Sequence, residues 1–544
     1  MKSYWINSVK KEEFESLHND KKVDVCIIGG GLTGLTTAYY LSKTNLNVAL
    51  LEKTKLCEHT SGYTTAKITS QHGLFYHYLI QSQGREKAKQ YLEANEQAIQ
   101  NIQNIISEEN IECDFEKQNA YVFTKDQNEV AKIKREVEDV KSLGKEAKFV
   151  TETKLPFPIL GAIEFTDQAQ FNPCKYAQGL VKAIQNSSKE NQEETVSVNM
   201  NKESSSIKNI NKEEEKQKET NKMNSNQKTS QIEIFENTKV IELKKQEEEY
   251  EILTENGNKV VSKYVVIASH YPIINAPGFY FLKMYQSLSY VVVAETSMDS
   301  LEGIYINSEK PTISIRMVEN DGKKLLMLGG FDHKTGEKKD LSQSYVDLEK
   351  VAKQIDPQCN IIYKWCTEDC ITLDKIPYIG EFSSMMPNVY LGTGYNKWGM
   401  TSSNIAANII VDKILGKENP YEEVFTSTRM EPVKNRQEVG NIVKEVAQSL
   451  IVSQFKIPQE KLSNISIGEG GIVEIEGQKI GIYRDENDKI FAIKPTCSHL
   501  GCELTWNNLE KTWDCPCHGS RFTYTGKSIY DPSIRDLQRI EIIE

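Results

Sequence analysis

The stretch VDVCIIGGGLTG, residues 23–34, decides the fold of most of this 544-residue chain. It begins with a short, mostly apolar run that predicts a buried strand, and the following LTTAYYLSK, residues 35–43, has helical periodicity. A second apolar run, residues 47–52, predicts the next strand and ends at Glu52. Strand, glycine turn, helix and strand together predict a βαβ unit.

Gly29, Gly31 and Gly34 form the pattern GxGxxG in that turn. The first glycine allows the tight turn, the second lets the backbone approach a pyrophosphate, and the third permits close packing of helix on strand. The helix N-terminus offers free N–H groups to the phosphates, and Glu52 could bond ribose hydroxyls. In this context the motif predicts a dinucleotide, which could be FAD or NAD.

Three other segments favour FAD over NAD. Residues 60–66, TSGYTTA, carry small hydroxyl side chains that suit a loop passing beneath a flavin. Residues 392–401, GTGYNKWGMT, form a second glycine-rich entry to a helix, whose positive dipole end can face the flavin carbonyls. Residues 372–380, TLDKIPYIG, lie just upstream of that helix entry and are the third segment that favours FAD. We therefore expect FAD.

The tail of the chain contains two Cys–His pairs, CSHLGC at 497–502 and CPCHGS at 515–520. Such pairs suit a [2Fe–2S] cluster in which two thiolates hold one iron and two imidazoles hold the other. Zinc is the alternative, since structural zinc sites use the same ligand types. The predicted cluster ligands are Cys497, His499, Cys515 and His518.

This tail resembles the Rieske domain, in which the matching cysteines form a disulfide. The resemblance implies a disulfide between Cys502 and Cys517 and a small all-β domain over residues 464–544. High-potential Rieske proteins often carry a tyrosine where this chain has Phe522, whereas Ser520 is present. With one sulfur hydrogen bond fewer, we expect a cluster potential in the middle of its range or below.

The segments from about Val23 to Gly416 resemble the D-amino-acid-oxidase superfamily of FAD-dependent oxidoreductases. With its tail, the chain resembles the bacterial Rieske-tailed, DadA-like flavoproteins. The resemblance implies an α/β, Rossmann-like FAD-binding body of the glutathione-reductase-2 type with an α+β substrate domain, and it implies FAD and a [2Fe–2S] cluster as cofactors. The residues that it assigns to FAD are Gly29, Gly31, Gly34, Glu52, Thr64, Thr65, Val240, Gly399, Met400 and Thr401.

We expect an oxidoreductase body over residues 1–430, a linker over 418–463 and the cluster domain after it. Residues 186–231 have almost no large apolar side chains, so this insertion cannot bury enough surface to offset its ordering entropy and is predicted to be disordered. The FAD-binding part is expected at about 22–80, 165–185, 232–275 and 366–416, and the substrate part at about 81–164 and 276–365.

The family resemblance implies hydride removal from a carbon that bears an amine, after which FAD would pass electrons singly to the cluster. Such sites often hold the substrate carboxylate with an arginine. Arg316 in ISIR, residues 313–316, is the catalytic candidate, with Tyr395 as a second. A solvated strand position is the alternative for Arg316. Two further functions stay open: an electron-transfer flavo-iron–sulfur protein without amine oxidation, and a flavin monooxygenase.

Composition limits the partners. A net charge of −11 argues against nucleic acid, because phosphate binding needs a basic face. The first fifteen residues lack the apolar core of a signal peptide, and no run approaches the ~20 apolar residues of a membrane span. Scattered cysteines suit a reducing compartment. We expect a soluble, cytoplasmic protein with an amine or amino-acid substrate and an electron-accepting or electron-donating partner protein.

Overall fold

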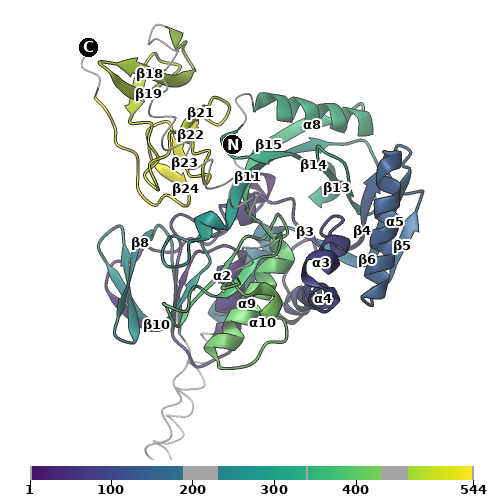
Figure 1. The fold of residues 1–544 in the computed structure, drawn as a ribbon, viewed down its shortest axis with the longest axis horizontal. Helices are drawn as coiled ribbons and strands as arrows, with labels where there is room; N and C mark the ends of the chain where they lie inside the picture. The colour runs from purple at the N-terminus through teal and green to yellow at the C-terminus, as the bar shows by residue number, and fades with distance from the viewer. Residues whose placement is uncertain (1–2, 188–230, 321, 338–340, 430–463, 542–544) are drawn as a thin grey trace, which may run out of the picture.

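The computed structural model describes residues 3–187, 231–320, 322–337, 341–429 and 464–541. Most of the predicted insertion at 186–231 and of the predicted linker at 418–463 lies outside the described residues. The described strands form an eight-stranded and a nine-stranded sheet in the body and two smaller sheets in the tail. Figure 1 shows the tail, coloured yellow, seated on one end of the body beside β11 and β15.

The eight-stranded sheet is built around β1, which pairs in parallel with β2 on one side and with β10 on the other. Its inner strands are almost wholly buried, as expected for a parallel sheet covered on both faces. The strand order is β16-β17-β10-β1-β2-β7, and the β8–β9 hairpin is attached to β10. The bounds are β1 Lys21–Ile28, β2 Val48–Leu51, β7 Ile232–Phe235, β8 Val240–Gln246, β9 Glu249–Thr254, β10 Lys259–Ile267, β16 Tyr378–Glu381 and β17 Val389–Thr393.

The nine-stranded sheet is mixed and follows the order β15-β11-β14-β13-β12-β4-β6-β3, with β5 paired to β6. Long antiparallel strands dominate it, because hairpins join consecutive segments of the chain. The bounds are β3 Lys67–Ile68, β4 Glu116–Thr124, β5 Ala147–Val150, β6 Gly161–Gln170, β11 Met284–Glu295, β12 Ile304–Asn307, β13 Ile313–Asn320, β14 Lys323–Lys334 and β15 Asn360–Thr372.

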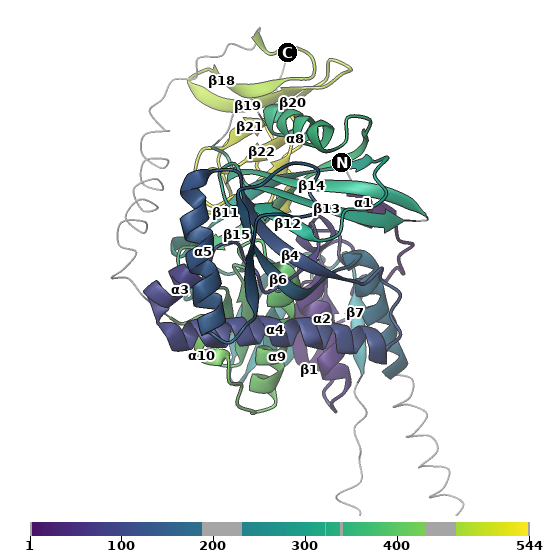
Figure 2. The same cartoon turned by 90° about the vertical axis from the view of Figure 1, so that its right-hand side faces the viewer.

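Helices cover both sheets. The helix of the opening motif, α2, packs against α9, and α4 packs against α9 where it crosses the body in Figure 2. A further helix occupies residues 173–187. The bounds are α1 Tyr4–Asn7, α2 Leu32–Ser42, α3 Tyr76–Gln83, α4 Arg85–Glu108, α5 Gln127–Ser142, α8 Ser342–Ile355, α9 Gly399–Ile414 and α10 Glu422–Phe425, with 3-10 turns η1 Thr60–Gly62 and η2 Tyr280–Leu282.

The two parts of the body differ at their borders from the expected ranges. Residues 165–170 and 366–372 continue the long strands β6 and β15 of the nine-stranded sheet, so they lie with the substrate part. Residues 422–429, which fall within both the expected body and the expected linker, pack on the body. Arg429 pairs with Asp374, with its Nε 2.6 Å from Oδ2, and its guanidinium lies 4.0 Å from the centre of the Tyr378 ring. The borders of the FAD-binding and substrate parts are therefore determined by strand pairing, and the end of the body by this ion pair. Both are contacts between residues far apart in the sequence.

The tail consists of two small antiparallel sheets, as expected for the all-β domain. In both Figures 1 and 2 the four-stranded sheet lies nearer the body, and the three-stranded sheet is farther out. The bounds are β18 Gly470–Ile475, β19 Gln478–Arg484 and β20 Ile490–Ile493 for the outer sheet, and β21 Thr505–Asn507, β22 Thr512–Asp514, β23 Arg521–Thr523 and β24 Ser528–Tyr530 for the inner one. None of the helices that the structure describes has both the length and the apolar character of a transmembrane span.

Candidate functional site

The turn between β1 and α2 is shaped by its glycines. Gly29 has φ +114°, and a Cβ on it would lie 2.5 Å from the carbonyl oxygen of Ala268. A Cβ on Gly34 would lie 1.9 Å from the carbonyl oxygen of Gly29, so only glycine lets α2 approach the turn this closely. Gly31 is the N-cap of α2 and supplies no capping side chain. The positive end of the helix dipole is therefore available to an anion.

Glu52, at the end of β2, organises the same turn. Its Oε2 accepts a hydrogen bond from the Gly30 N–H at 2.8 Å, and its Oε1 accepts one from the Thr54 N–H at 2.9 Å. Burial raises the pKa of Glu52, while the backbone donors favour its charged form. The carboxylate also lines the large cavity of the body, where a ribose could reach it.

A cavity of 980 Å³ runs from this turn to the start of α9. Its size and its two helix N-termini fit an elongated dinucleotide such as FAD. At the far end, α9 begins without a side-chain cap after Trp398, which leaves its positive dipole end facing the cavity. Gly34 and Thr401 are buried behind the wall. The predicted cofactor residues that line the cavity are Gly29, Gly31, Glu52, Thr64, Thr65, Val240, Gly399 and Met400.

Two tryptophans hold the predicted flavin loop. The indole of Trp5 donates to the Thr64 carbonyl at 2.7 Å, and the indole of Trp365 donates to the Tyr63 carbonyl at 2.8 Å. Both rings are almost completely buried. These two residues were missed by sequence reasoning, because nothing in the sequence around them indicates which distant backbone they contact.

Arg316 does not line the cavity. Its side chain is 1% exposed, its Nη1 donates to the Ala66 carbonyl at 2.7 Å, and its guanidinium lies 5.2 Å from the centre of the Trp5 ring. Burial lowers the pKa of Arg316 to about 9. Neither the predicted substrate contact nor the solvated alternative describes this position. Ser314, two residues earlier on the same strand face, does line the cavity.

Lys67 supplies a cation on the cavity wall near the flavin loop. Its Nζ donates to Thr65 Oγ1 at 2.6 Å and to Ser314 Oγ at 2.8 Å. Burial lowers the pKa of Lys67 to about 7, and the nearby charge of Arg316 adds to this effect. Lys67 follows TSGYTTA directly in the sequence, but no sequence pattern around it indicates that its side chain faces the cavity.

Asp369 supplies a carboxylate to the same cavity. Burial raises the pKa of Asp369 to about 6, although the positive charges of Lys397 and Lys67 oppose the rise. Tyr395, the second catalytic candidate, also lines the cavity, and its hydroxyl lies 2.9 Å from Thr33 Oγ1. Burial raises the pKa of Tyr395 above its usual range. Among the charged groups of the cavity, Lys67 and Asp369 therefore offer a cation and a carboxylate whose pKa values lie near neutrality.

Two similar loops carry the predicted cluster ligands. In the first, Cys497 N–H donates to the Cys502 carbonyl at 2.8 Å. In the second, Cys515 N–H donates to the Ser520 carbonyl, also at 2.8 Å. A disulfide between Cys502 and Cys517 joins the loops, and Cys497 and Cys515 are buried free thiols. Both loops thus present one thiol and one imidazole to the space between them.

Within the described residues, each predicted histidine ligand has a buried ring nitrogen that is free to bind a metal. Nδ1 of His499 is buried without a hydrogen-bond partner among the described residues, while its Nε2 lies 2.7 Å from Asn275 Oδ1. An Nε2–H donor leaves the Nδ1 lone pair for a metal. Both ring nitrogens of His518 are likewise buried and unpartnered in the described structure. Hydrogen bonding to Cys515 lowers the pKa of Cys497 to about 7, which favours its thiolate form.

The second ligand loop is seated directly on the body. Gln286 Nε2 donates to the His518 carbonyl at 3.1 Å and to the Asp531 carbonyl at 2.5 Å. The ring of Phe281 meets the His518 ring edge-on, with centroids 5.6 Å apart. A Cβ on Gly519 would lie 2.5 Å from the Cβ of Gln286. A glycine is needed here because the loop and β11 approach each other so closely.

Residues of the tail also complete the wall of the body's cavity. Lys53 Nζ, from the turn after β2, pairs with Asp531 Oδ2 at 3.1 Å. The ring of Tyr530 stands edge-on to His59, with centroids 6.0 Å apart. The tail residues that line the cavity are Lys527, Ser528, Ile529, Tyr530, Asp531, Ile534 and Asp536.

This fold and these two sites define a flavoenzyme with an attached iron–sulfur domain. The family described as FAD dependent oxidoreductase matches residues 24–216 and 227–413, and the family described as Rieske [2Fe-2S] domain matches residues 457–541. The chain belongs to the FAD-dependent oxidoreductase family and carries a C-terminal Rieske domain. It is an oxidoreductase that binds FAD and a [2Fe–2S] cluster.

Among individual proteins, the chain is 35% identical over 540 residues to YhfW of Bacillus subtilis, whose name describes it as a Rieske 2Fe-2S iron-sulfur protein; the match covers 99% of this chain and 97% of that one. The body has the fold of glycine oxidase from Geobacillus kaustophilus, with a TM-score of 0.59 and 16% identity over 75% of this chain and 99% of that one. L-proline dehydrogenase from P. horikoshii gives a TM-score of 0.58 and 15% identity over 75% and 98%.

Proposed function

We propose that the chain oxidises a small amine or amino acid at FAD and passes the electrons singly to its Rieske cluster. One observation carries this proposal: residues 527–531 of the tail form part of the wall of the cavity that holds the FAD fingerprint. A cofactor in that cavity would lie against the domain that binds the cluster. The named activities of the two structural neighbours, which concern glycine and L-proline, support an amino acid as substrate.

The charged groups of the cavity suit a zwitterionic substrate. Lys67 can hold a carboxylate, and its bonds to Thr65 and Ser314 fix the direction of its Nζ. Asp369 offers a carboxylate to the substrate's amine. In this assignment Lys67 takes the role that the sequence had suggested for Arg316.

Removal of hydride from a carbon requires a neutral amine beside it. When bound, FAD supplies the acceptor for that hydride. Asp369 can take the proton from the substrate's ammonium group, because burial brings its pKa to about 6, closer to neutrality than an ordinary carboxyl. Lys67 keeps its charge below about pH 7 and orients the carboxylate. Tyr395 lines the same wall and limits the space beside α9.

Four residues of the tail, at positions 497, 499, 515 and 518, are proposed to hold the cluster, which accepts one electron at a time when bound. The contacts of Gln286 and Asn275 with the two histidine loops support a short path between the sites. The electrons would then leave to a separate one-electron carrier protein.

Anaerobic titration with a panel of amines and amino acids, read by flavin absorbance and then by EPR, tests the proposal. A productive substrate should bleach the flavin and generate the signal of the reduced Rieske cluster. In a His518→Ala variant the same substrate should bleach the flavin without that signal. Bleaching of the wild-type flavin with a cluster that stays oxidised would refute the internal transfer.

The same experiment separates the two alternative functions. If no amine bleaches the flavin but a reduced carrier protein does, the protein is an electron-transfer flavoprotein. An oxygen-dependent hydroxylated product would indicate a monooxygenase.

A further inference from the structure

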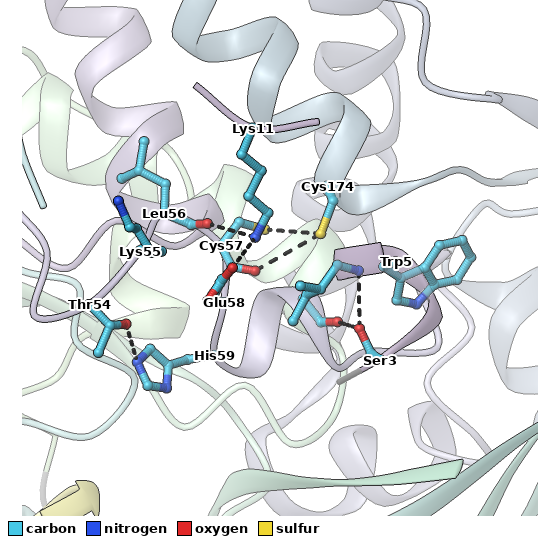
Figure 3. Close-up of polar contacts among 12 residues, drawn as sticks. Ser3, Trp5, Lys11, Thr54, Lys55, Leu56, Cys57, Glu58, His59 and Cys174 are labelled. Carbon is cyan, nitrogen blue, oxygen red and sulfur yellow. Dashed lines mark hydrogen bonds and ion pairs between the residues drawn. The ribbon is translucent and has the colours of Figure 1, made fainter. Parts of the chain in front are cut away.

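Two cysteines far apart in the sequence meet beside the cofactor cavity. Cys57 Sγ and Cys174 Sγ lie 4.0 Å apart, and both side chains are almost completely buried. Figure 3 shows the two sulfurs facing each other, with Lys11 beside them. Cys57 lies on the loop that follows β2, and Cys174 lies in the first turn of the helix at residues 173–187. The pair thus links the cofactor loop to a separate element of the body.

The surroundings of Cys174 favour its thiolate. Its N–H donates to Asn172 Oδ1 at 3.1 Å at the start of the helix, where the helix dipole stabilises negative charge. The hydrogen bond with Cys57 is the main cause that lowers the pKa of Cys174, and the charge of Lys11 adds to it. The same hydrogen bond and burial raise the pKa of Cys57. Of the two thiols, Cys174 is therefore the one that loses its proton more readily.

Cys57 connects this pair to the cavity. It lines the cavity wall together with Glu58, and its N–H donates to the Gly30 carbonyl at 3.1 Å in the glycine turn. Lys11 Nζ anchors the same loop through the Leu56 carbonyl at 3.3 Å and Glu58 Oε1 at 3.1 Å. Cys57 thus places the pair at the cavity wall, from which a small oxidant would approach, although Cys174 itself lies behind Cys57 and neither sulfur is at the outer surface.

We propose that Cys57 and Cys174 form a reversible disulfide in response to hydrogen peroxide and that this disulfide fixes the loop that lines the FAD cavity. The Cys174 thiolate attacks one peroxide oxygen, hydroxide leaves, and Cys174 becomes a sulfenic acid. The Cys57 thiol then attacks the Cys174 sulfur; the S–O bond breaks and water leaves. In sum, two thiols and one peroxide give one disulfide and two waters, so the thiols lose two electrons and the peroxide gains them.

The bond requires the sulfurs to approach from 4.0 Å to a disulfide length of about 2.05 Å. The bond would therefore need a rotation of the Cys57 side chain and a small shift of its loop. Once formed, the bond ties the loop of residues 52–62 to the helix at residues 173–187, so opening of the cavity wall for FAD release would be hindered.

Peptide mapping of the full-length holoprotein tests the proposal. The protein is treated with equimolar hydrogen peroxide, free thiols are alkylated, and the non-reduced digest is analysed by mass spectrometry. We expect a cross-linked species that contains Cys57 and Cys174, has a mass lower by two hydrogen atoms than the two separate peptides, and disappears after dithiothreitol. Full alkylation of both thiols after peroxide, or sulfinic acid at either one without the cross-link, would overturn the proposal.

Flavin release on heating gives the second readout. In oxidised wild-type protein, the release temperature should shift upward by a few degrees, and dithiothreitol should reverse the shift. Cys174→Ser should abolish both the cross-link and the shift. Cys359→Ser is the matched control, because Cys359 is equally buried but packs in a different core cluster, and it should retain both effects. A cross-link that leaves flavin release unchanged would refute the proposed effect on the loop. Neither readout depends on the identity of the substrate.

Discussion

Asn275 of the body lies 2.7 Å from the outer ring nitrogen of His499, a predicted cluster ligand 224 positions later in the chain. The amide oxygen accepts the Nε2–H of the imidazole, which sets the tautomer and leaves Nδ1 toward the cluster site. Such an acceptor also increases electron donation from the imidazole to a metal. Through this contact the body would tune a predicted ligand that belongs to another domain.

Removing this acceptor should raise the midpoint potential of the cluster. In Asn275→Ala the imidazole donates less charge, and the oxidised cluster is stabilised less. A hydrogen bond of ~1 kcal/mol corresponds to a shift of roughly 40 mV for one electron. Redox titration followed by EPR measures it. Asn487→Ala, on an exposed turn of the same tail, should leave the potential unchanged. A downward shift in Asn275→Ala would contradict the assigned role.

Loss of one imidazole ligand should remove the cluster without removing FAD. His518→Ala deletes a proposed ligand, whereas the FAD cavity is built mainly by the body. We expect loss of bound iron and of the Rieske EPR signal, with the flavin absorbance retained. His18→Ala, at an exposed position, is the control and should keep both cofactors. A Rieske signal that persists in His518→Ala would show that the ligand assignment is wrong.

Substrate oxidation should have a bell-shaped pH dependence. Asp369, with a pKa of about 6, is a base only when deprotonated, so kcat/KM should fall as the pH drops below about 6. Lys67, with a pKa of about 7, is a cation only when protonated, so the rate should also fall as the pH rises above about 7. Initial rates across pH 4–9 with an artificial acceptor measure both limbs. Asp369→Asn should lose the acid limb, and survival of that limb in the variant would exclude Asp369.

Lys67 and Arg316 can be separated by their effects on KM. Lys67→Met removes a cation that lines the cavity, and loss of a charge-assisted bond of about 1.5–3 kcal/mol should raise KM for a carboxylate substrate by roughly 10- to 150-fold. Arg316→Met should change KM by less than about twofold, since this side chain lies under Trp5 and outside the cavity. Steady-state kinetics decide between them. A large rise in KM for Arg316→Met together with an unchanged KM for Lys67→Met would show that Arg316 binds the carboxylate instead.

Gly34→Ala should abolish FAD binding. Its Cβ would lie 1.9 Å from the Gly29 carbonyl oxygen, so the turn must shift and the phosphate cradle is distorted. We expect the bound FAD to fall at least about tenfold, measured as flavin released from purified protein. Ser142→Ala, at an exposed position at the end of α5 and outside the cavity, is the control and should fold and retain FAD. Full FAD occupancy in Gly34→Ala would contradict the role of this contact.

The sequence by itself determined the two cofactor classes and the order of the domains. The GxGxxG turn and the Cys–His pairs are contiguous motifs, and their chemistry depends on local properties: a glycine's lack of Cβ and the spacing of ligands along one loop. For the same reason, the motif glycines that line the FAD cavity, Gly29 and Gly31, could be chosen before the fold was known, whereas Thr65 was implied by the family resemblance.

Only the tertiary structure decided which charged groups face the substrate and how the two domains meet. Strand periodicity places Ser314 and Arg316 on one face, but it cannot reveal that Trp5 from the N-terminal helix covers the arginine and leaves Lys67 at the cavity. Nor can it reveal that Asn275 and Gln286 hold the cluster loops. These contacts join residues hundreds of positions apart, and they arise from the packing of whole sheets, which no local pattern encodes.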